Sequence, residues 1–127
     1  PAGVAFSESC LGFLAAERGD DDAARAHHAA ALAAAVDSGD AAALALAVEG
    51  SATVALAAGV PLRAATLLGA AGAMWDSIPT AIATHRPDVD GAIAAVRTEL
   101  GSARSARELA AGAALDRGGV LAVARGV

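Results

Sequence analysis

Two adjacent histidines, His27 and His28, are the first candidates for chemistry, because imidazole is a common metal ligand and carboxylates lie nearby at Asp20–Asp22. Neighbouring helix positions point about 100° apart, so one ion does not easily take both rings. A metal-binding pair on a helix stands at i and i+4, and the matching positions here hold only alanine and leucine. We therefore expect no metal here, and a partly exposed pair with one ring facing a helix interface.

A second polar group combines His85 with Asp88 and Asp90, next to Pro87. It could be an acid–base or ligand cluster in a loop. A catalytic dyad also needs a nucleophile or an oxyanion donor, and only serine and threonine hydroxyls lie near. Helix-capping polar residues explain the set equally well, so the sequence predicts neither an enzyme nor a cofactor.

The chain has a single cysteine, Cys10, which excludes an intramolecular disulfide and fits a reducing compartment. Cys10 falls between Phe6 and Phe13 on one helical stripe. This position predicts a buried thiol that serves as a small apolar side chain.

Glu49 interrupts an apolar helix, so it either points outward or pairs with an arginine, for which we expect Arg63. Trp75 is expected in the core; alternatively it lines a groove or a dimer contact. Partner contacts are expected mainly on the first and third helices. The candidate partner-binding residues are Glu8, Glu49, Thr53 and Trp75.

Composition favours close-packed helices in one domain that covers residues 1–127. Alanine, the best helix former, dominates the sequence, and no stretch alternates like a strand. The net charge is −5 with no basic cluster, which argues against direct nucleic-acid binding.

The apolar stretch 41–62 carries Glu49 near its middle. Inserting a carboxylate at the centre of a membrane helix costs about 2.5–3.5 kcal/mol, so we expect no membrane helix here. Without a signal peptide, and beginning at Pro1, the chain is expected to be a cytoplasmic fragment of a larger protein.

Two segments forty positions apart end and restart a helix in the same way. Gly19 is followed by Asp20–Asp22 and an alanine-rich helix, and Gly59 by Val60, Pro61 and another. Such units bury their apolar faces by stacking on one another. The sequence predicts an all-α, right-handed superhelix of about three antiparallel helix pairs. The expected units cover about 2–38, 40–79 and 86–125, with a loop or a short helical turn over 80–86 and Ser102 capping the sixth helix.

The first unit resembles the tetratricopeptide repeat (TPR). Leu11-Gly12 and Ala24 match the leucine–glycine pair and the small residue of that motif, and Ala52 and Ala64 hold the small positions in the second unit. Glu8 and Ala15 stand where tryptophan and tyrosine are usual. The period of forty exceeds the usual thirty-four, so the repeat is degenerate.

A second resemblance covers nearly the whole chain. Gly59–Trp75 (GVPLRAATLLGAAGAMW), the pair Arg86-Pro87 and Leu100–Arg125 (LGSARSARELAAGAALDRGGVLAVAR) are similar to the C-terminal helical-repeat region of actinobacterial transcriptional regulators. That family includes the LuxR-type, AfsR/SARP-type and adenylate-cyclase-linked ATPase proteins. Gly112 and Leu115 keep their places, whereas Ser105 and Leu109 stand where the family has aromatic residues.

The resemblance implies a place beside an ATPase module and, in LuxR-type members, before a helix-turn-helix. Neither motif occurs in these 127 residues. The expected function is non-catalytic protein–protein interaction in signal transduction, with a protein partner, the regulator's own ATPase or DNA-binding modules, or a second copy in a homodimer. The alternative is a small-molecule effector sensor with a pocket near Met74 and Trp75.

Overall fold

The computed structural model describes residues 2–78 and 87–126, which form helices and contain no strand. The all-α class expected from the sequence is therefore confirmed for this part of the chain. The predicted loop over 80–86 lies outside the described residues. The helices are α1 (Ala2–Glu17), α2 (Asp21–Ser38), α3 (Ala41–Ala57), α4 (Pro61–Asp76), α5 (Pro87–Leu100), α6 (Ser102–Ala113) and α7 (Arg117–Ala124).

The ends of α1 and α3 have the same hydrogen-bonded geometry. Gly19 and Gly59 both adopt a left-handed conformation, with φ of 77° and 79°. The residue after each glycine donates its backbone N–H to the carbonyl four residues before the glycine, at 2.9 Å in both cases. This is the hydrogen bond that closes a helix at a left-handed glycine. The stop-and-restart signal read from the sequence is confirmed at both positions.

Helix starts follow the sequence signals in most cases. Asp20 and Asp40 accept hydrogen bonds from the backbone N–H groups three residues later, at 3.1 and 2.8 Å, and Pro61 opens α4. Such caps satisfy donors that the first helical turn leaves unpaired. The capping role expected of Ser102 is wrong: Gly101 precedes the helix and α6 has no side-chain cap. Ser102 already has helical geometry, so its hydroxyl does not stand at the capping position.

Buried positions recur with the same spacing of forty residues. The inner face of α1 and α2 reappears on α3 and α4, where seven of the nine buried residues of the first unit have a buried counterpart in the second; Leu32 and Ala35 do not. The equivalent buried pairs are Ala5/Ala45, Ser9/Glu49, Gly12/Ala52, Ala15/Ala55, Ala24/Ala64, His28/Leu68 and Ala31/Ala71. The two helical hairpins therefore repeat in their packing as well as in their turns.

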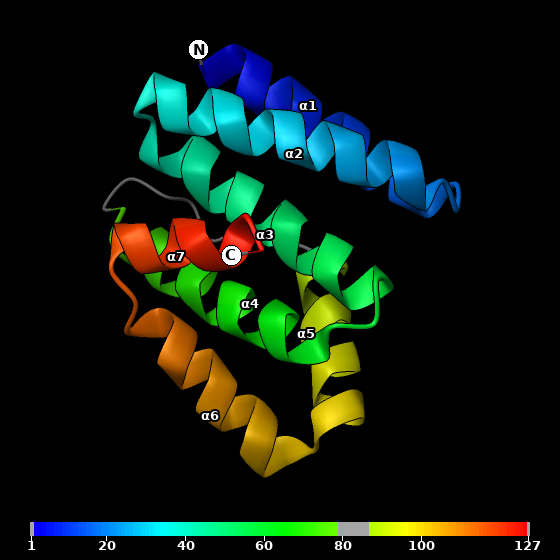
Figure 1. The fold of residues 1–127 in the computed structure, drawn as a ribbon, viewed down its shortest axis with the longest axis vertical. Helices are drawn as coiled ribbons and strands as arrows, with labels where there is room; N and C mark the ends of the chain where they lie inside the picture. The colour runs from blue at the N-terminus through cyan, green and yellow to red at the C-terminus, as the bar shows by residue number, and fades with distance from the viewer. Residues whose placement is uncertain (1, 79–86, 127) are drawn as a thin grey trace.

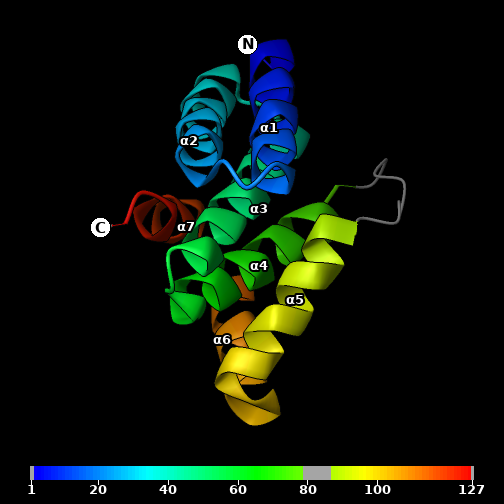
Figure 2. The same ribbon diagram turned by 90° about the vertical axis from the view of Figure 1, so that its right-hand side faces the viewer.

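The helices pack largely on their neighbours in sequence (Figures 1 and 2). The antiparallel hairpin α1–α2 lies at one end of the molecule, α2 and α1 contact α3, and α3 runs against α4. Beyond α4 the order changes. α6 packs closely along α4, α5 and α6 contact each other much less, and α7 returns to contact α3 and α4. The third unit is thus less regular than the first two.

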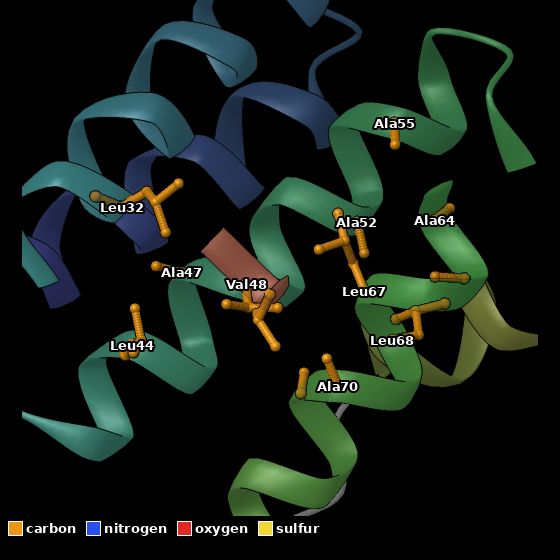
Figure 3. Packing of buried hydrophobic residues seen from close by; sticks show 14 of the residues in the cluster. Leu32, Leu44, Ala47, Val48, Ala52, Ala55, Ala64, Leu67, Leu68 and Ala70 are labelled. Atoms are coloured by element: carbon orange, nitrogen blue, oxygen red, sulfur yellow. The ribbon is translucent and has the colours of Figure 1, made fainter. Parts of the chain in front are cut away.

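Small side chains build the core, as Figure 3 shows around α3 and α4. Alanine accounts for most of the buried apolar residues, with Leu67, Val48 and Val96 the largest apolar side chains that are fully buried. Two glycines bring α4 and α6 together: a Cβ at Gly69 would strike the Leu109 backbone, and one at Gly112 would strike the Thr66 backbone. Gly112, which matches the regulator family in sequence, therefore allows α6 to pack closely against α4.

The predicted inner stripe of α1 is only partly correct. Phe6 and Phe13 are half-buried, but Cys10 is exposed, so its expected burial is wrong. The buried residues of α1 are Ala5, Ser9, Gly12 and Ala15. Small residues let α1 approach α2 and α3 closely, and this turns the larger side chains away from the interface.

Within residues 2–78 and 87–126, no helix combines the length and hydropathy that crossing a lipid bilayer requires.

Candidate functional site

His27 and His28 point in different directions, as their spacing predicts. The Nδ1 atom of His27 lies 2.7 Å from Oε2 of Glu8, so this pair links α2 to α1 at a partly buried position. His28 is 1% exposed. In the described part of the chain, no three histidine, cysteine or acidic side chains gather where one metal ion could be held.

The ring of His28 fills a space that two glycines leave open. A Cβ at Gly12 would lie 2.6 Å from the ring, and one at Gly50 would collide with its Nδ1. The ring of Phe13 packs edge-on, with centroids 4.7 Å apart. Both glycines are therefore needed if an imidazole is to pass between α1 and α3.

Neither ring nitrogen of His28 has a hydrogen-bond partner among the residues that the structure describes. Burial, with a smaller contribution from the neighbouring charge of His27, lowers the pKa of His28 from 6.5 to about 4. His28 is therefore neutral at physiological pH. A buried polar side chain without partners destabilises the fold, so this residue marks a local departure from ideal packing.

Two of the predicted partner-binding residues meet: Glu49 is buried, and Trp75 beside it is partly buried. The indole Nε1 of Trp75 donates a hydrogen bond to Oε1 of Glu49 at 2.6 Å, joining α4 to α3. Glu49 is 2% exposed. Its predicted pairing with Arg63 is wrong, because Arg63 at the start of α4 lies in a groove with other arginines. The sequence could not reveal this, because the carboxylate partner depends on how α3 and α4 cross.

The substitution Glu49→Ala is expected to lower the free energy of unfolding by about 2 kcal/mol, because it leaves the Trp75 N–H without its acceptor. Glu49→Gln keeps an acceptor oxygen and should cost less. Urea denaturation followed by Trp75 fluorescence measures both. Equal losses in the two variants would show that the hydrogen bond to Trp75 is not what Glu49 contributes.

The remaining predicted partner-binding residues lie elsewhere. Glu8 contacts His27, as described above. Thr53 donates its hydroxyl to the Gly50 carbonyl at 2.7 Å and lines a small cleft of about 140 Å³ beside Arg25. The four predicted residues therefore do not form one common surface, and only Glu49 and Trp75 meet.

The outer face of α1 carries large apolar side chains in solvent. Val4, Leu11 and Leu14 are 52%, 44% and 48% exposed, and Cys10 lies one turn before Leu14. These four residues, which we call the α1 outer face, share one side of the helix because their spacings are three, four and seven. From the sequence, Glu8 was the only partner-binding residue predicted on α1, because periodicity placed the apolar side chains of this helix in the core.

A cavity of about 340 Å³ lies between the C-terminal half of α4 and α7. Its lining is mostly apolar and includes Leu44, Met74, Val120 and Leu121. Met74 therefore borders a cavity, as the alternative interpretation expected. Trp75 does not line it and bonds to Glu49 instead.

The polar group near Pro87 is only partly described. His85 and the side chain of Asp88 lie outside the described residues, and Asp90 is exposed on α5.

Comparison with protein-family models, with characterised proteins and with solved structures returned no match to this chain.

Proposed function

We propose that this chain is a non-catalytic helical-repeat module that docks other proteins through the α1 outer face. In this proposal α1–α2, α3–α4 and the less regular α5–α6 are successive units of a TPR-like right-handed superhelix. The forty-residue repeat of helix ends and buried positions in the first two hairpins supports it. The described helices leave the α1 outer face uncovered, and an exposed apolar face of this kind marks an interaction site.

The proposal rests on the exposure of three large apolar side chains, Val4, Leu11 and Leu14, on one side of α1. The opposite side of the same helix is buried. A helix that is apolar all round is normally covered on more than one side. Here α2 and α3 cover only the inner side of α1. The α1 outer face therefore has the character of an interface.

The size of this face sets the expected strength of binding. Covering three half-exposed aliphatic side chains contributes about 3 kcal/mol. Association itself costs about 4–15 kcal/mol in lost motion, so this face alone cannot hold a tight complex. We expect weak, reversible docking, as suits a regulatory contact, unless the partner adds further contacts.

Our proposal extends to the context of the module, for which the resemblance is the only support. We propose that it belongs to a multidomain transcriptional regulator in the cytoplasm, where it restrains an ATPase module or receives a partner's signal.

A second copy is the simplest occupant of the α1 outer face in the isolated chain. Sedimentation equilibrium should show weak, concentration-dependent self-association of the wild type. The double substitution Leu11→Glu and Leu14→Glu should abolish it, because charges would be forced into an apolar contact. Leu62→Glu is the matched control, since Leu62 is 37% exposed on α4, away from this face.

Two outcomes would contradict the proposal. One is a wild type that stays monomeric at every accessible concentration. The other is self-association that the double variant retains, which would move the interface to another surface. Circular dichroism of each variant checks that the helices are intact.

The cavity beside Met74 favours the alternative function, a small-molecule sensor. Its volume lies at the lower end of the range for ligand pockets, and its lining is mostly apolar. An apolar metabolite bound there should change the fluorescence of the neighbouring Trp75. A titration without any change would remove this alternative.

A further inference from the structure

A groove of about 500 Å³ is lined by α2, α3, the first turn of α4 and the end of α7. Figures 1 and 2 show α7 crossing close to α3, below α2. Arg25 comes from α2, Arg63 from α4, and Arg125 from the residue that ends α7. Three separate elements thus bring three arginines to one groove.

The groove is positive although the chain is acidic. The protein has fourteen carboxylate residues against nine arginines, yet no carboxylate side chain among the described residues lines this groove. Among the described residues, Arg63 and Arg125 have neither a salt bridge nor a side-chain hydrogen bond. Arg25 bonds to Asp22 at 2.9 Å, but both side chains are mostly exposed. Such surface pairs are weak, so Arg25 can turn to another anion.

The remaining lining is largely apolar. It includes Leu32, Ala33, Val54 and Ala55, together with one edge of His28, whose ring nitrogens have no partner. Apolar walls lower the local dielectric constant and strengthen the attraction between an arginine and an anion. The groove therefore combines a cationic rim with an apolar lining, the two properties that an amphiphilic anion requires.

We propose that this groove binds a small organic oxyanion, a carboxylate or a phosphate monoester, that carries an apolar tail. Guanidinium groups match carboxylate and phosphate oxygens with paired, charge-assisted hydrogen bonds. Three like charges also repel one another, and a bound anion relieves that repulsion. The volume lies within the range of known small-molecule sites.

A purely structural role explains part of the arrangement. The Arg63 guanidinium lies close to Gly126, within 3.6 Å of where a Cβ would stand, and positive charge is favourable at the C-terminal end of α7. Helix stabilisation accounts for Arg63 and Arg125. It does not account for Arg25, or for the lack of acidic side chains in the part of the lining that the structure describes. This ligand site is separate from the α1 outer face and goes beyond the docking function.

Isothermal titration calorimetry with octyl phosphate, kept below its micelle concentration, tests the proposal. We expect one saturable site whose affinity falls as salt is added. Inorganic phosphate should bind at least tenfold more weakly because it lacks the tail, and octanol should not bind measurably because it lacks the charge.

Arg63→Gln and Arg125→Gln should each weaken octyl phosphate binding about tenfold, and the double variant about a hundredfold. Arg104→Gln is the matched control, an exposed arginine on α6 outside the groove, and should bind as the wild type does. Urea denaturation of each variant separates lost binding from lost folding. The proposal is overturned by absent binding, by equal affinity in the double variant, or by an equal loss in Arg104→Gln.

The same oxyanion could instead be presented by a lipid headgroup. Phosphatidylserine vesicles provide that arm of the test. We expect no cosedimentation, because an acidic protein is repelled by an anionic surface. Vesicle binding that needs Arg63 and Arg125, without binding of octyl phosphate, would replace the free ligand by a membrane and contradict the proposal.

Discussion

Replacing Gly112 by alanine is expected to lower the free energy of unfolding by about 3 kcal/mol. The new Cβ would collide with the Thr66 backbone, and a backbone in a helix cannot turn aside as a flexible side chain can. α6 would have to move away from α4, which is its main packing partner. Gly69→Ala should act in the same way from the opposite helix, where it meets the Leu109 backbone. Urea denaturation monitored by circular dichroism measures both losses.

Gly72 supplies the matched control on the same helix. It is exposed, and nothing lies within 4 Å of its would-be Cβ. Gly72→Ala should therefore raise the stability by about 0.5–1 kcal/mol, because alanine is the better helix former. A Gly112→Ala variant as stable as the wild type would mean that α4 and α6 do not approach as described.

Acid should destabilise the protein through His28. Its pKa is about 4 in the folded chain and 6.5 as the unperturbed value, so the unfolded state binds the proton first. The contribution of neutral His28 is complete above pH 6.5 and is lost as the pH falls toward 4. The difference between the two pKa values corresponds to about 3 kcal/mol. Urea denaturation between these two pH values measures the loss.

Carboxylates also titrate in this range, so variants must isolate the histidine. Leucine is the natural replacement, because Leu68 occupies the equivalent buried position of the second unit. His28→Leu should lose most of the acid sensitivity, whereas His27→Gln should keep it, because burial is the larger cause of the shift. An identical pH dependence in His28→Leu and the wild type would refute this role.

Turn chemistry made the helix boundaries predictable. Gly19 and Gly59 signal a helix end because a left-handed backbone favours glycine, and aspartates one residue before a helix signal its start. On α5 the apolar residues Val89, Ile93, Val96 and Leu100 recur every three or four positions, which predicts one inner stripe. Val96 is buried and the other three pack on the core. On this helix the large apolar residues do face inward, so periodicity is a sound guide.

The same rule failed on α1 and α6. On α1 it placed Cys10 inside. On α6 the spacing predicts an inner stripe of Ala106, Leu109 and Ala113; Leu109 does pack on the core, but the two alanines are exposed. The buried residues of α6 are Ser105 and Gly112. Periodicity ranks side chains by hydrophobicity, whereas these interfaces are set by how closely two backbones approach. Where the two backbones lie close together, the inner position therefore holds a small residue, and a larger apolar residue lies outside.

The candidate sites were harder to predict because distant residues form them. His28 lies between Gly12 and Gly50, which belong to different helices. Arg125 lines the same groove as Arg25 only because α7 turns back to contact α3 and α4. Neither contact leaves a local signal in the sequence. Spacing arguments reach one or two helical turns, so they could assess the adjacent histidines but not their surroundings.

Cys10 provides a test of the central claim. This claim is that the α1 outer face is a docking surface with small residues packed beneath it. This thiol is exposed beside Leu14, and no other cysteine competes with it. The rate of thiol modification by Ellman's reagent should match that of the urea-unfolded chain when the protein is dilute, and should fall as the concentration rises and α1 faces pair. A slow rate in dilute, folded protein, or a rate that does not depend on concentration, would contradict the account.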